Sequence, residues 1–271
     1  MDRLAHALLR VRPAPLASLL KHVLGVRRRE IPAPDGARFH ADPASHFGDA
    51  LLSHGCYEPE LTAVVRTLVR PGDLFVDVGA NEGYFSVMAG KAQPLARIIC
   101  IEPQSRLHPA IEKNLQLNAL TNITLCRLAL AAQDGERTLY LAPDTNTGSS
   151  GLVRPRRWGF LREKVGTTTL DRILATSASP RARLVKIDCE GAELEILQGA
   201  ERALRERAVD FLSVDYHPAI RGEDNAREID AFLRGHGYRV SRAANGVWLY
   251  HLPGLETALA PLGAVTTVAE L

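Results

Sequence analysis

Apolar strands that alternate with helices restrict the fold of this chain more than any other feature. Short apolar runs predicted as strands lie at residues 73–79, 96–103, 122–130, 183–191 and 210–218, with helical patterns between most of them. Strands that alternate with helices build a parallel sheet with helices on both faces. The run Arg-Ile-Ile-Cys-Ile within residues 96–103 agrees, because a strand buried on both faces is apolar throughout. The sequence therefore predicts an α/β fold with a mostly parallel sheet.

Three segments depart from this alternation. Residues 135–143 have the pattern of an added strand, in a pause between about residues 131 and 169. Near the C-terminus two strand patterns meet at Asn245-Gly246, a dipeptide typical of hairpin turns, so we expect the sheet to end in an antiparallel hairpin. Residues 1–55 are helical and then turn-rich, and we expect an N-terminal helical appendage there, followed by one larger domain over residues 56–271.

The N-terminal helical segment is basic and carries an apolar stripe. Five of its side chains share one helical face: Leu16, Leu19, Leu20, Val23 and Leu24. An apolar stripe usually packs against protein, so we expect this helix to lie against the rest of the chain or against a partner subunit, the second case giving a homo-oligomer. A helix that lies on a membrane surface is the alternative. No apolar run reaches the length of about 18–20 residues that a transmembrane span needs.

Composition excludes several kinds of partner and site. The net charge of +2 gives no overall electrostatic case for nucleic-acid binding. The four cysteines form no Cys-x-x-Cys pair, which argues against a zinc site and against a thioredoxin-like site. Apolar surroundings suggest that these cysteines are reduced, and no signal-peptide pattern begins the chain, so we expect a cytoplasmic protein.

The stretch VDVGANEGYFS, residues 76–86, has the pattern of a strand, a tight glycine turn and a helix, which is a geometry that brings backbone close to a ligand. Asp77 and Asn81 stand at the carboxyl end of the predicted strand, where open α/β sheets bind ligands. Glu102 ends the next strand and suits the hydroxyls of a ribose. The sequence thus predicts a nucleoside-binding loop.

The same loop lacks the third glycine of a dinucleotide fingerprint and has no lysine or arginine for a phosphate. Asp77 and Glu82 beside a pyrophosphate would be unfavourable, whereas carboxylates beside a sulfonium and an amino group would be favourable. These residues therefore indicate S-adenosylmethionine as the cofactor. An NAD-dependent oxidoreductase is the enzymatic alternative, and a non-catalytic cofactor-binding module is the other.

Taken in order, five segments resemble the successive blocks of FkbM-type S-adenosylmethionine-dependent methyltransferases. They are FVDVGANEGYFS, CIEPQ, TLDRIL, VKIDCEGAELEILQGA and VDYHP, and the resemblance covers about residues 55–252. It implies a class I methyltransferase fold with a Rossmann-like sheet. It also implies O-methylation of a hydroxyl on a saccharide or secondary metabolite, with a small-molecule or glycan acceptor and no nucleic acid.

The resemblance also implies roles for individual residues. Gly79, Asn81 and Gly83 match the cofactor loop, Asp77 the acid before it, and Glu102 the ribose-binding acid. Further along the chain, Asp188 and Glu190 match the acidic block after a core strand. The last block of the family commonly has Glu-x-His, and this chain has Asp215-Tyr216-His217 instead.

Transfer of a methyl group to a hydroxyl needs a group that takes the hydroxyl proton. We expect His217 to be this base, with Asp188 and Glu190 as the other catalytic residues, because all three follow the carboxyl ends of central strands. His217 could instead be structural, and Glu190 could cap the following helix. Three carboxylates and a histidine could also hold Mg²⁺ or Ca²⁺, but nothing in the sequence fixes such a site, and we expect none.

A basic stretch between the core strands is the candidate acceptor region. Arg154, Arg157 and Trp158 lie in it, and arginines with an aromatic ring suit a carboxylated or phosphorylated sugar. A solvated charged helix is the alternative interpretation. We add Asp215 to this predicted acceptor set. The preceding loop, DTNTGSSG, could contribute Asn146, Ser149 and Ser150, or could be a solvated turn.

Overall fold

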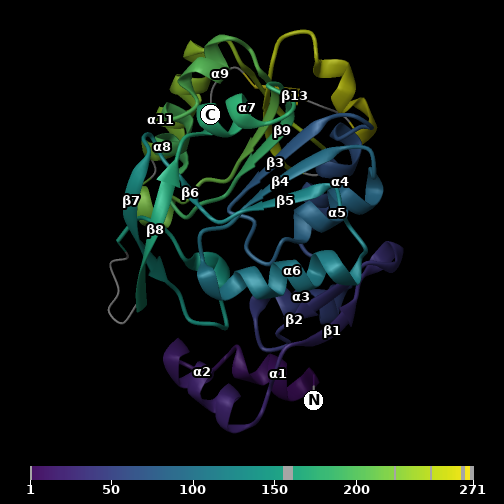
Figure 1. The fold of residues 1–271 in the computed structure, drawn as a ribbon, viewed down its shortest axis with the longest axis vertical. Coiled ribbons are helices and arrows are strands. Elements are labelled where there is room, and N and C mark those ends of the chain that lie inside the picture. The colour runs from purple at the N-terminus through teal and green to yellow at the C-terminus, as the bar shows by residue number, and fades with distance from the viewer. Residues whose placement is uncertain (1, 155–160, 223, 245, 264–265, 269–271) are drawn as a thin grey trace.

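The computed structural model describes residues 2–154, 161–222, 224–244, 246–263 and 266–268. Its centre is an eight-stranded sheet in the spatial order β13-β11-β12-β10-β9-β3-β4-β5. The parallel part runs from β5 (Ile123–Cys126) through β4 (Arg97–Ile101), β3 (Leu74–Val78) and β9 (Ala182–Ile187) to β10 (Val209–Val214). The predicted, mostly parallel α/β sheet is confirmed (Figure 1).

The far edge of the sheet reverses direction. Strand β12 (Trp248–His251) lies antiparallel to β10, and β11 (Arg239–Arg242) pairs antiparallel with β12. A short β13 (Thr266–Thr267) extends this edge. The predicted antiparallel hairpin is therefore present, and Ala243 and Val247 close its turn through a backbone hydrogen bond of 3.0 Å. Asn245, on which the prediction rested, lies outside the described residues.

Helices cover both faces of this sheet because its strands are apolar on both sides. On one face, α4 (Pro59–Leu68) and α5 (Tyr84–Ala92) share a hydrophobic cluster with Phe75 of β3 and Phe211 of β10. On the other, Val76 and Leu212 belong to a second cluster. That cluster contains residues of α7 (Leu170–Thr176), α8 (Glu193–Gln198), α9 (Glu201–Arg205) and α11 (Asp224–Gly235). Apart from α1 to α3 of the N-terminal segment, which are described below, the other helices are α6 (His108–Leu117), α10 (Pro218–Arg221), η1 (Pro34–Gly36), η2 (Ser105–Leu107), η3 (Thr147–Ser149) and η4 (Glu256–Leu262).

A separate three-stranded sheet stands beside the central one, at the left of Figure 1. It consists of β6 (Ala129–Leu130), β8 (Leu161–Thr168) and β7 (Gly135–Leu141), and β7 is the added strand that the sequence predicts. The interpretation of the basic stretch as a helix is wrong from Leu161 onward. There the chain is the start of β8, whose Arg162 pairs in register with Tyr140 of β7.

The N-terminal elements are α1 (Asp2–Leu8), α2 (Ala14–Val23), the hairpin of β1 (Arg29–Pro32) and β2 (Arg38–Ala41), and α3 (His46–His54). Ile31, Phe39 and Phe47 join the hydrophobic cluster that contains α4 and α5. Residues 31–51 therefore contribute to the core that supports the central sheet. The division into domains at residue 55 stays a prediction.

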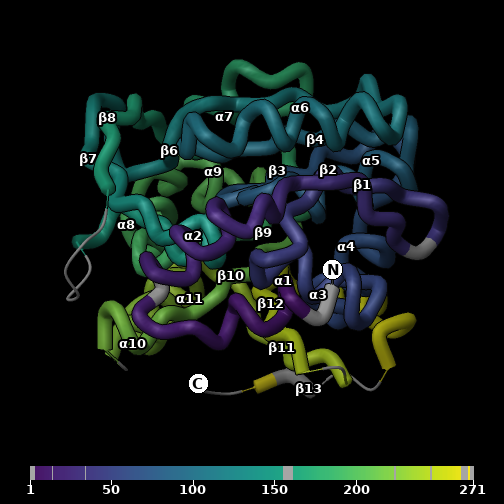
Figure 2. Tube along the Cα trace, turned by 90° about the horizontal axis from the view of Figure 1, so that it is seen from below, coloured from purple at the N-terminus to yellow at the C-terminus, as the bar shows by residue number. Residues whose placement is uncertain are grey.

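Helices α1 and α2 form one end of the molecule, below β1 and β2 in Figure 1 and in the foreground of Figure 2. The expectation that the apolar stripe of α2 packs against the rest of the chain holds only for Leu20, which packs on the cluster of Ala5, Leu8, Val26 and Ala44, and packing against a partner subunit stays a prediction. The other four side chains of the stripe are exposed. Leu19 is 59% exposed and Val23 is 72% exposed, while Ala17 and Lys21 on the opposite side are buried. Among the described residues, no helix is long and apolar enough to cross a membrane.

Candidate active site

The carboxyl ends of three parallel strands converge on one cavity. It encloses about 790 Å³, including its open mouth, and residues that follow β3, β4 and β9 line it. The wall residues of the predicted site are Gly79, Asn81, Glu102 and Asp188. Phe47 and Tyr57 from the N-terminal part of the chain complete the apolar wall, which sequence reasoning did not anticipate. A cleft with this mixture of apolar walls and a few polar groups is typical of a small-molecule site.

The loop after β3 owes its path to two glycines. Gly79 has φ 73° and Gly83 has φ 77°, values that favour glycine because a Cβ crowds the backbone there. A Cβ on Gly79 would also lie 1.9 Å from the carbonyl oxygen of Asp188. Asn81, with φ 51°, adopts the same region, which asparagine tolerates better than most residues. The loop therefore lies tightly against the end of β9.

Glu102 faces this loop from the end of β4. Its Oε2 accepts a hydrogen bond of 2.7 Å from the backbone N–H of Asn81, and its Oε1 accepts one of 2.9 Å from the N–H of Gln104. Burial raises the pKa of the Glu102 carboxyl to about 7, against the effect of these two donors. Because each carboxylate oxygen has a further lone pair, Glu102 can also accept hydrogen bonds from a ligand in the cavity.

The acids that the sequence argument placed beside a sulfonium have partners within the protein. Asp77 is fully buried and accepts hydrogen bonds from the N–H and hydroxyl of Ser86, and it is not among the residues that line the cavity. Glu82 lines the cavity, but its carboxylate accepts two hydrogen bonds from the guanidinium of Arg28, at 2.5 and 3.1 Å. The electrostatic reasoning from these two acids is therefore wrong, and cofactor binding by Asp77 stays a prediction that its contacts do not favour.

Lys186 is a site residue that sequence reasoning missed. Its side chain is only 3% exposed, and its Nζ donates a 2.8 Å hydrogen bond to the carbonyl of Gly79. The same ammonium lies 3.5 Å from Asp77 and 3.6 Å from Asp188, and these acids raise its pKa despite burial. A lysine inside the apolar run Arg-Leu-Val-Lys-Ile was the available signal, because a buried charge needs partners.

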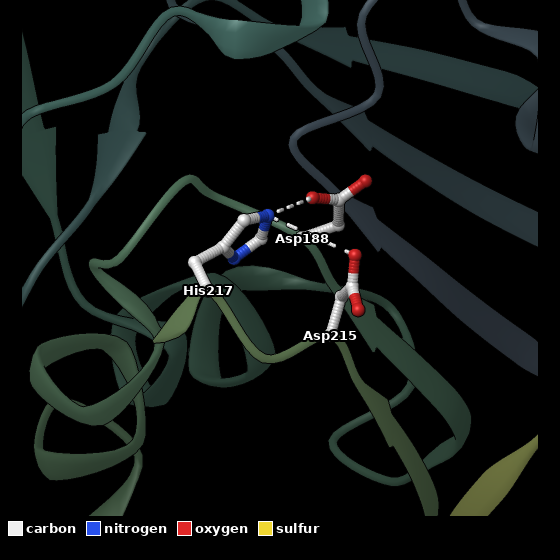
Figure 3. Close-up of side chains that lie close together, drawn as sticks. All are labelled: Asp188, Asp215 and His217. Atoms are coloured by element: carbon white, nitrogen blue, oxygen red, sulfur yellow. Dashed lines mark ion pairs between the residues drawn. The ribbon is translucent and has the colours of Figure 1, made fainter. Parts of the chain in front are cut away.

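His217, Asp188 and Asp215 gather after β9 and β10 (Figure 3), and Glu190 also lies close to the imidazole. The Nε2 atom of His217 lies 3.5 Å from Asp188, 3.7 Å from Asp215 and 3.8 Å from Glu190. The side chains of Asp188 and Asp215 point toward the imidazole from two neighbouring strands. The structure thus brings together the three predicted catalytic residues and Asp215, which the sequence had grouped with the acceptor set.

A fourth acid, Glu193 of α8, orients the imidazole and was also missed. Its buried Oε1 lies 2.9 Å from Nδ1 of His217 and accepts hydrogen bonds from the N–H groups of Cys189 and Gly191. Although burial opposes it, the hydrogen bond and charge of Glu193, with those of Glu190 and Asp188, raise the pKa of His217 to about 9. His217 is therefore protonated at neutral pH, which argues against it as the base in the free protein.

The pKa values of Glu190 and Asp215 are raised as well, which for a carboxyl group favours the neutral form. Burial raises the pKa of Glu190 to about 7, and burial together with Asp188 raises the pKa of Asp215. Glu190 also has φ 53°, a backbone conformation that a glutamate rarely adopts and that is frequent at functional sites. The alternative that Glu190 only caps the following helix has no hydrogen bond to support it. The amides of Cys189 and Gly191 donate to Glu193 instead.

A family model decides what kind of protein this site belongs to. The model of the methyltransferase FkbM domain matches residues 77–240, which is more than half of the chain and includes every site residue described above except Arg28, Phe47 and Tyr57. The chain belongs to the FkbM methyltransferase family. The resemblance stated from the sequence blocks is thereby confirmed, and so is the class I methyltransferase fold with its Rossmann-like sheet.

Three relatives show how widely this FkbM chain is related. Methyltransferase sdnD of Sordaria araneosa is 27% identical over 62% of this chain and 74% of its own length. Hexuronic acid methyltransferase AglP of Haloferax volcanii is 26% identical over 59% and 64%. The 31-O-demethyl-FK506 methyltransferase FkbM of Streptomyces tacrolimicus is 26% identical over 64% and 75%. Among solved structures, a rRNA-methylase from Clostridium thermocellum aligns over 79% of this chain and 96% of its own, with 11% identity and a TM-score of 0.46.

A second cavity of the FkbM domain lies next to the first. It encloses about 630 Å³ beyond the ends of β9, β10 and β12, and Glu58, Asp188, Asp215 and Trp248 are among the residues that line it. Lys186 and Asp188 line both cavities. Asp188 therefore stands at the boundary between the two cavities.

Only part of the predicted acceptor region lies within the described residues. Arg154 is exposed and lines neither cavity, and Arg157 and Trp158 lie outside the described residues. Ser150 lines the larger cavity, but its hydroxyl already donates to the carbonyl of Thr147 at 2.8 Å. Asn146 and Ser149 bond to each other and line neither cavity. The loop thus closes over the cofactor cavity mainly through backbone and apolar atoms.

The acidic cluster contains a group of side chains of the kinds that bind a metal ion. One atom from each of Asp188, Asp215 and His217 lies within 4.8 Å of the others. These donors suit a hard divalent cation in type. The proton on Nε2 already occupies the position that a metal would need, because Nδ1 is committed to Glu193. The imidazolium therefore supplies a positive charge to the cluster without a metal.

Proposed function

We propose that this protein is an S-adenosylmethionine-dependent O-methyltransferase that acts on a hydroxyl of a saccharide or secondary metabolite. The observation that carries the proposal is the position of Asp188, a residue that follows β9 and lines both cavities. A donor in the larger cavity and an acceptor in the smaller one would meet at this residue. Membership of the FkbM family supplies the reaction type. The name of FkbM supports a secondary metabolite as acceptor, and that of AglP supports a saccharide, although the hexuronic acid in its name is an anionic one.

The larger cavity fits S-adenosylmethionine by its donor set. Glu102, with a free lone pair on each oxygen, would accept the ribose hydroxyls, and the tight turn at Gly79 lets backbone approach the ligand. Tyr57 and Phe85 give apolar contact on the other side. When bound, the cofactor supplies an activated methyl group on a sulfonium, so the protein needs only to align the acceptor and remove its proton.

In this proposal Asp188 accepts a hydrogen bond from the acceptor hydroxyl and aligns its oxygen. As the oxygen–carbon bond forms and the sulfur–carbon bond breaks, the hydroxyl proton passes to the cluster of Asp188, Glu190, Asp215 and His217. Because Glu190 and Asp215 lie within 4 Å of His217, these three groups titrate together, and the proton belongs to the set rather than to one residue. Glu190 suits this step best, since a base works best when its pKa is close to the ambient pH.

The smaller cavity favours a neutral acceptor over an anionic one. Glu58, Asp188 and Asp215 contribute carboxylates to it, and Trp248 contributes an aromatic surface. Carboxylates accept hydrogen bonds from sugar hydroxyls, and an aromatic ring packs on the apolar face of a sugar. A phosphorylated or carboxylated acceptor would meet like charge there. This preference differs from the prediction based on Arg154, which lines neither cavity.

The test is methyl transfer from isotopically labelled S-adenosylmethionine to a panel of neutral, uronic and phosphorylated glycans, read by mass spectrometry. We expect label on a neutral acceptor, with turnover lost in Asp188→Asn and retained in Asp224→Asn, a surface control on α11. Calorimetry with S-adenosylmethionine and with NAD tests the cofactor separately. Binding of NAD alone would contradict the proposal, and tight cofactor binding without transfer to any acceptor would favour a non-catalytic module.

A further inference from the structure

Helix α2 presents its apolar face to solvent. Among the described residues, seven large hydrophobic side chains are exposed, and five of them fall between residues 4 and 24. They are Leu4 of α1 and, around α2, Leu16, Leu19, Val23 and Leu24. The four of α2 are spaced as one face of a helix. Contiguous exposed apolar side chains mark a surface that binds a partner or a membrane, whereas scattered ones need no explanation.

The opposite, polar face of α2 attaches the helix to the protein. The side chain of Lys21 is buried and pairs with Asp42 and Asp144, and the hydroxyl of Ser18 also donates to Asp144. Rotating the helix to bury Leu19 would expose these contacts and leave Asp42 as a buried unpaired charge, which is strongly unfavourable. The outward direction of the apolar face is therefore fixed by buried ion pairs.

The segment that carries this apolar face is basic. Residues 1–30 contain seven lysines and arginines and only two acids, and of these cations Lys21 and Arg28 pair with acids outside the segment. Arg10, Arg12, His22 and Arg27 are exposed on or beside α1 and α2. A short amphipathic helix with exposed leucines and flanking arginines matches an anionic lipid surface, where apolar burial and attraction to lipid headgroups add together.

We propose that α1 and α2 dock this protein on the surface of an anionic phospholipid membrane. A second copy of the chain is the less favourable occupant, because pairing this face with itself would bring two basic segments together. The proposal does not depend on the enzymatic activity. It does place the larger cavity close to the bilayer surface, since the loop that carries Asp144 continues into Gly148 and Ser150, which line that cavity.

The test is sedimentation of the full chain with vesicles made of equal parts phosphatidylcholine and phosphatidylglycerol, and with vesicles of phosphatidylcholine alone. We expect binding to the anionic vesicles only, and loss of most of it in about 1 M salt, where the Debye length is about 3 Å. The variant Leu19→Ser/Val23→Ser should partition at least tenfold more weakly, about 1.4 kcal/mol. Leu95→Ser is the matched control, because Leu95 is 76% exposed but far along the chain from α2.

Circular dichroism and the melting temperature of each variant establish that the exposed substitutions leave the fold intact. Absence of binding to anionic vesicles at low salt would overturn the proposal, and so would unchanged binding of Leu19→Ser/Val23→Ser. Light scattering supplies the remaining outcome. The wild type could be a dimer that does not bind vesicles and that Leu19→Ser/Val23→Ser converts to a monomer. That result would assign the apolar face to a second copy of the chain and overturn the membrane proposal.

Discussion

The Nδ1 atom of His217 lies 2.9 Å from the buried Oε1 of Glu193, an oxygen that also accepts hydrogen bonds from two loop amides. This contact fixes the ring so that Nε2 faces Asp188, Glu190 and Asp215. A carboxylate that holds one imidazole nitrogen raises the pKa of the ring and orients the other nitrogen. The orientation of His217 within the acidic cluster therefore depends on the first residue of α8.

Glu193→Gln should lower the pKa of His217 from about 9, because the substitution removes the nearest negative charge but keeps the side-chain shape. A titration of the ring resonances by NMR measures this directly. Methyl transfer should fall by about 10–100-fold as the cluster loses its orientation, with cofactor affinity nearly unchanged. Glu201→Gln, an exposed change on α9, should leave both quantities as they are. A pKa that stays near 9 in Glu193→Gln would contradict the proposed coupling.

Stability should fall as the pH rises from 7 to 10. The folded-state pKa of His217 is raised above its unfolded value, so its stabilising effect is complete at low pH and disappears as the pH passes through about 9. The loss amounts to about 2 kcal/mol over this range. Glu190, whose pKa is also raised, acts in the same direction at lower pH. The free energy of unfolding, measured with denaturant at each pH, should decline more steeply for the wild type than for His217→Gln. Parallel curves for the two proteins would refute the stabilising role of the His217 charge.

Much of the site was predictable because parallel strands end at one edge of the sheet. The strand ends at Gly79, Glu102, Asp188 and Asp215 could be located from apolar runs alone, and the structure brings all four to the two adjoining cavities. The helical alternation and the Asn-Gly turn likewise predicted the sheet and its antiparallel edge. Local patterns suffice where the fold itself converts position along a strand into position in space.

Contacts between distant segments could not be predicted in this way. Arg28 contacts Glu82, 54 residues away in the sequence. Lys21 of α2 likewise contacts Asp144, which lies in the loop after β7. Without Arg28, Glu82 looks like a ligand-facing acid, and without the ion pairs of Lys21 the leucine stripe of α2 looks like a buried face. In both cases a buried charge found a partner that no local periodicity indicates. Exposed acids and buried ones have the same sequence signature.

Glu102→Gln should weaken S-adenosylmethionine binding by tenfold or more, since an amide accepts hydrogen bonds from ribose hydroxyls less strongly than a carboxylate. Because the pKa of Glu102 is about 7 in the free protein, wild-type affinity should rise between pH 6 and pH 8 as the carboxylate forms. This pH dependence should disappear in the variant. Calorimetry over the pH range measures both effects. Glu112→Gln on α6 is the control, and equal affinities of Glu102→Gln and wild type would exclude the ribose role.

Gly79→Ala and Gly72→Ala separate two demands on a glycine. Both residues have positive φ, 73° and 86°, and alanine there costs about 1–2 kcal/mol from the backbone alone. A Cβ at Gly72 meets nothing within 4 Å, whereas a Cβ at Gly79 would overlap the carbonyl of Asp188. Gly79→Ala should therefore be destabilised by about 3 kcal/mol or more and should displace Asp188. Similar unfolding free energies for the two variants would show that β3 and β9 separate easily at this end.

Removal of divalent metal should leave methyl transfer unchanged, because the imidazolium of His217 already places a positive charge among the carboxylates around it. A metal at this cluster would have to displace the proton from Nε2, whose pKa of about 9 opposes that exchange at neutral pH. In His217→Ala that positive charge is lost, and Asp188 and Asp215 are left with Glu190 as three acids near one point. Mg²⁺ or Mn²⁺ should then raise the melting temperature of the variant more than that of the wild type. Loss of wild-type turnover in EDTA, restored by Mg²⁺, would instead make the cluster a metal centre and His217 one of its ligands.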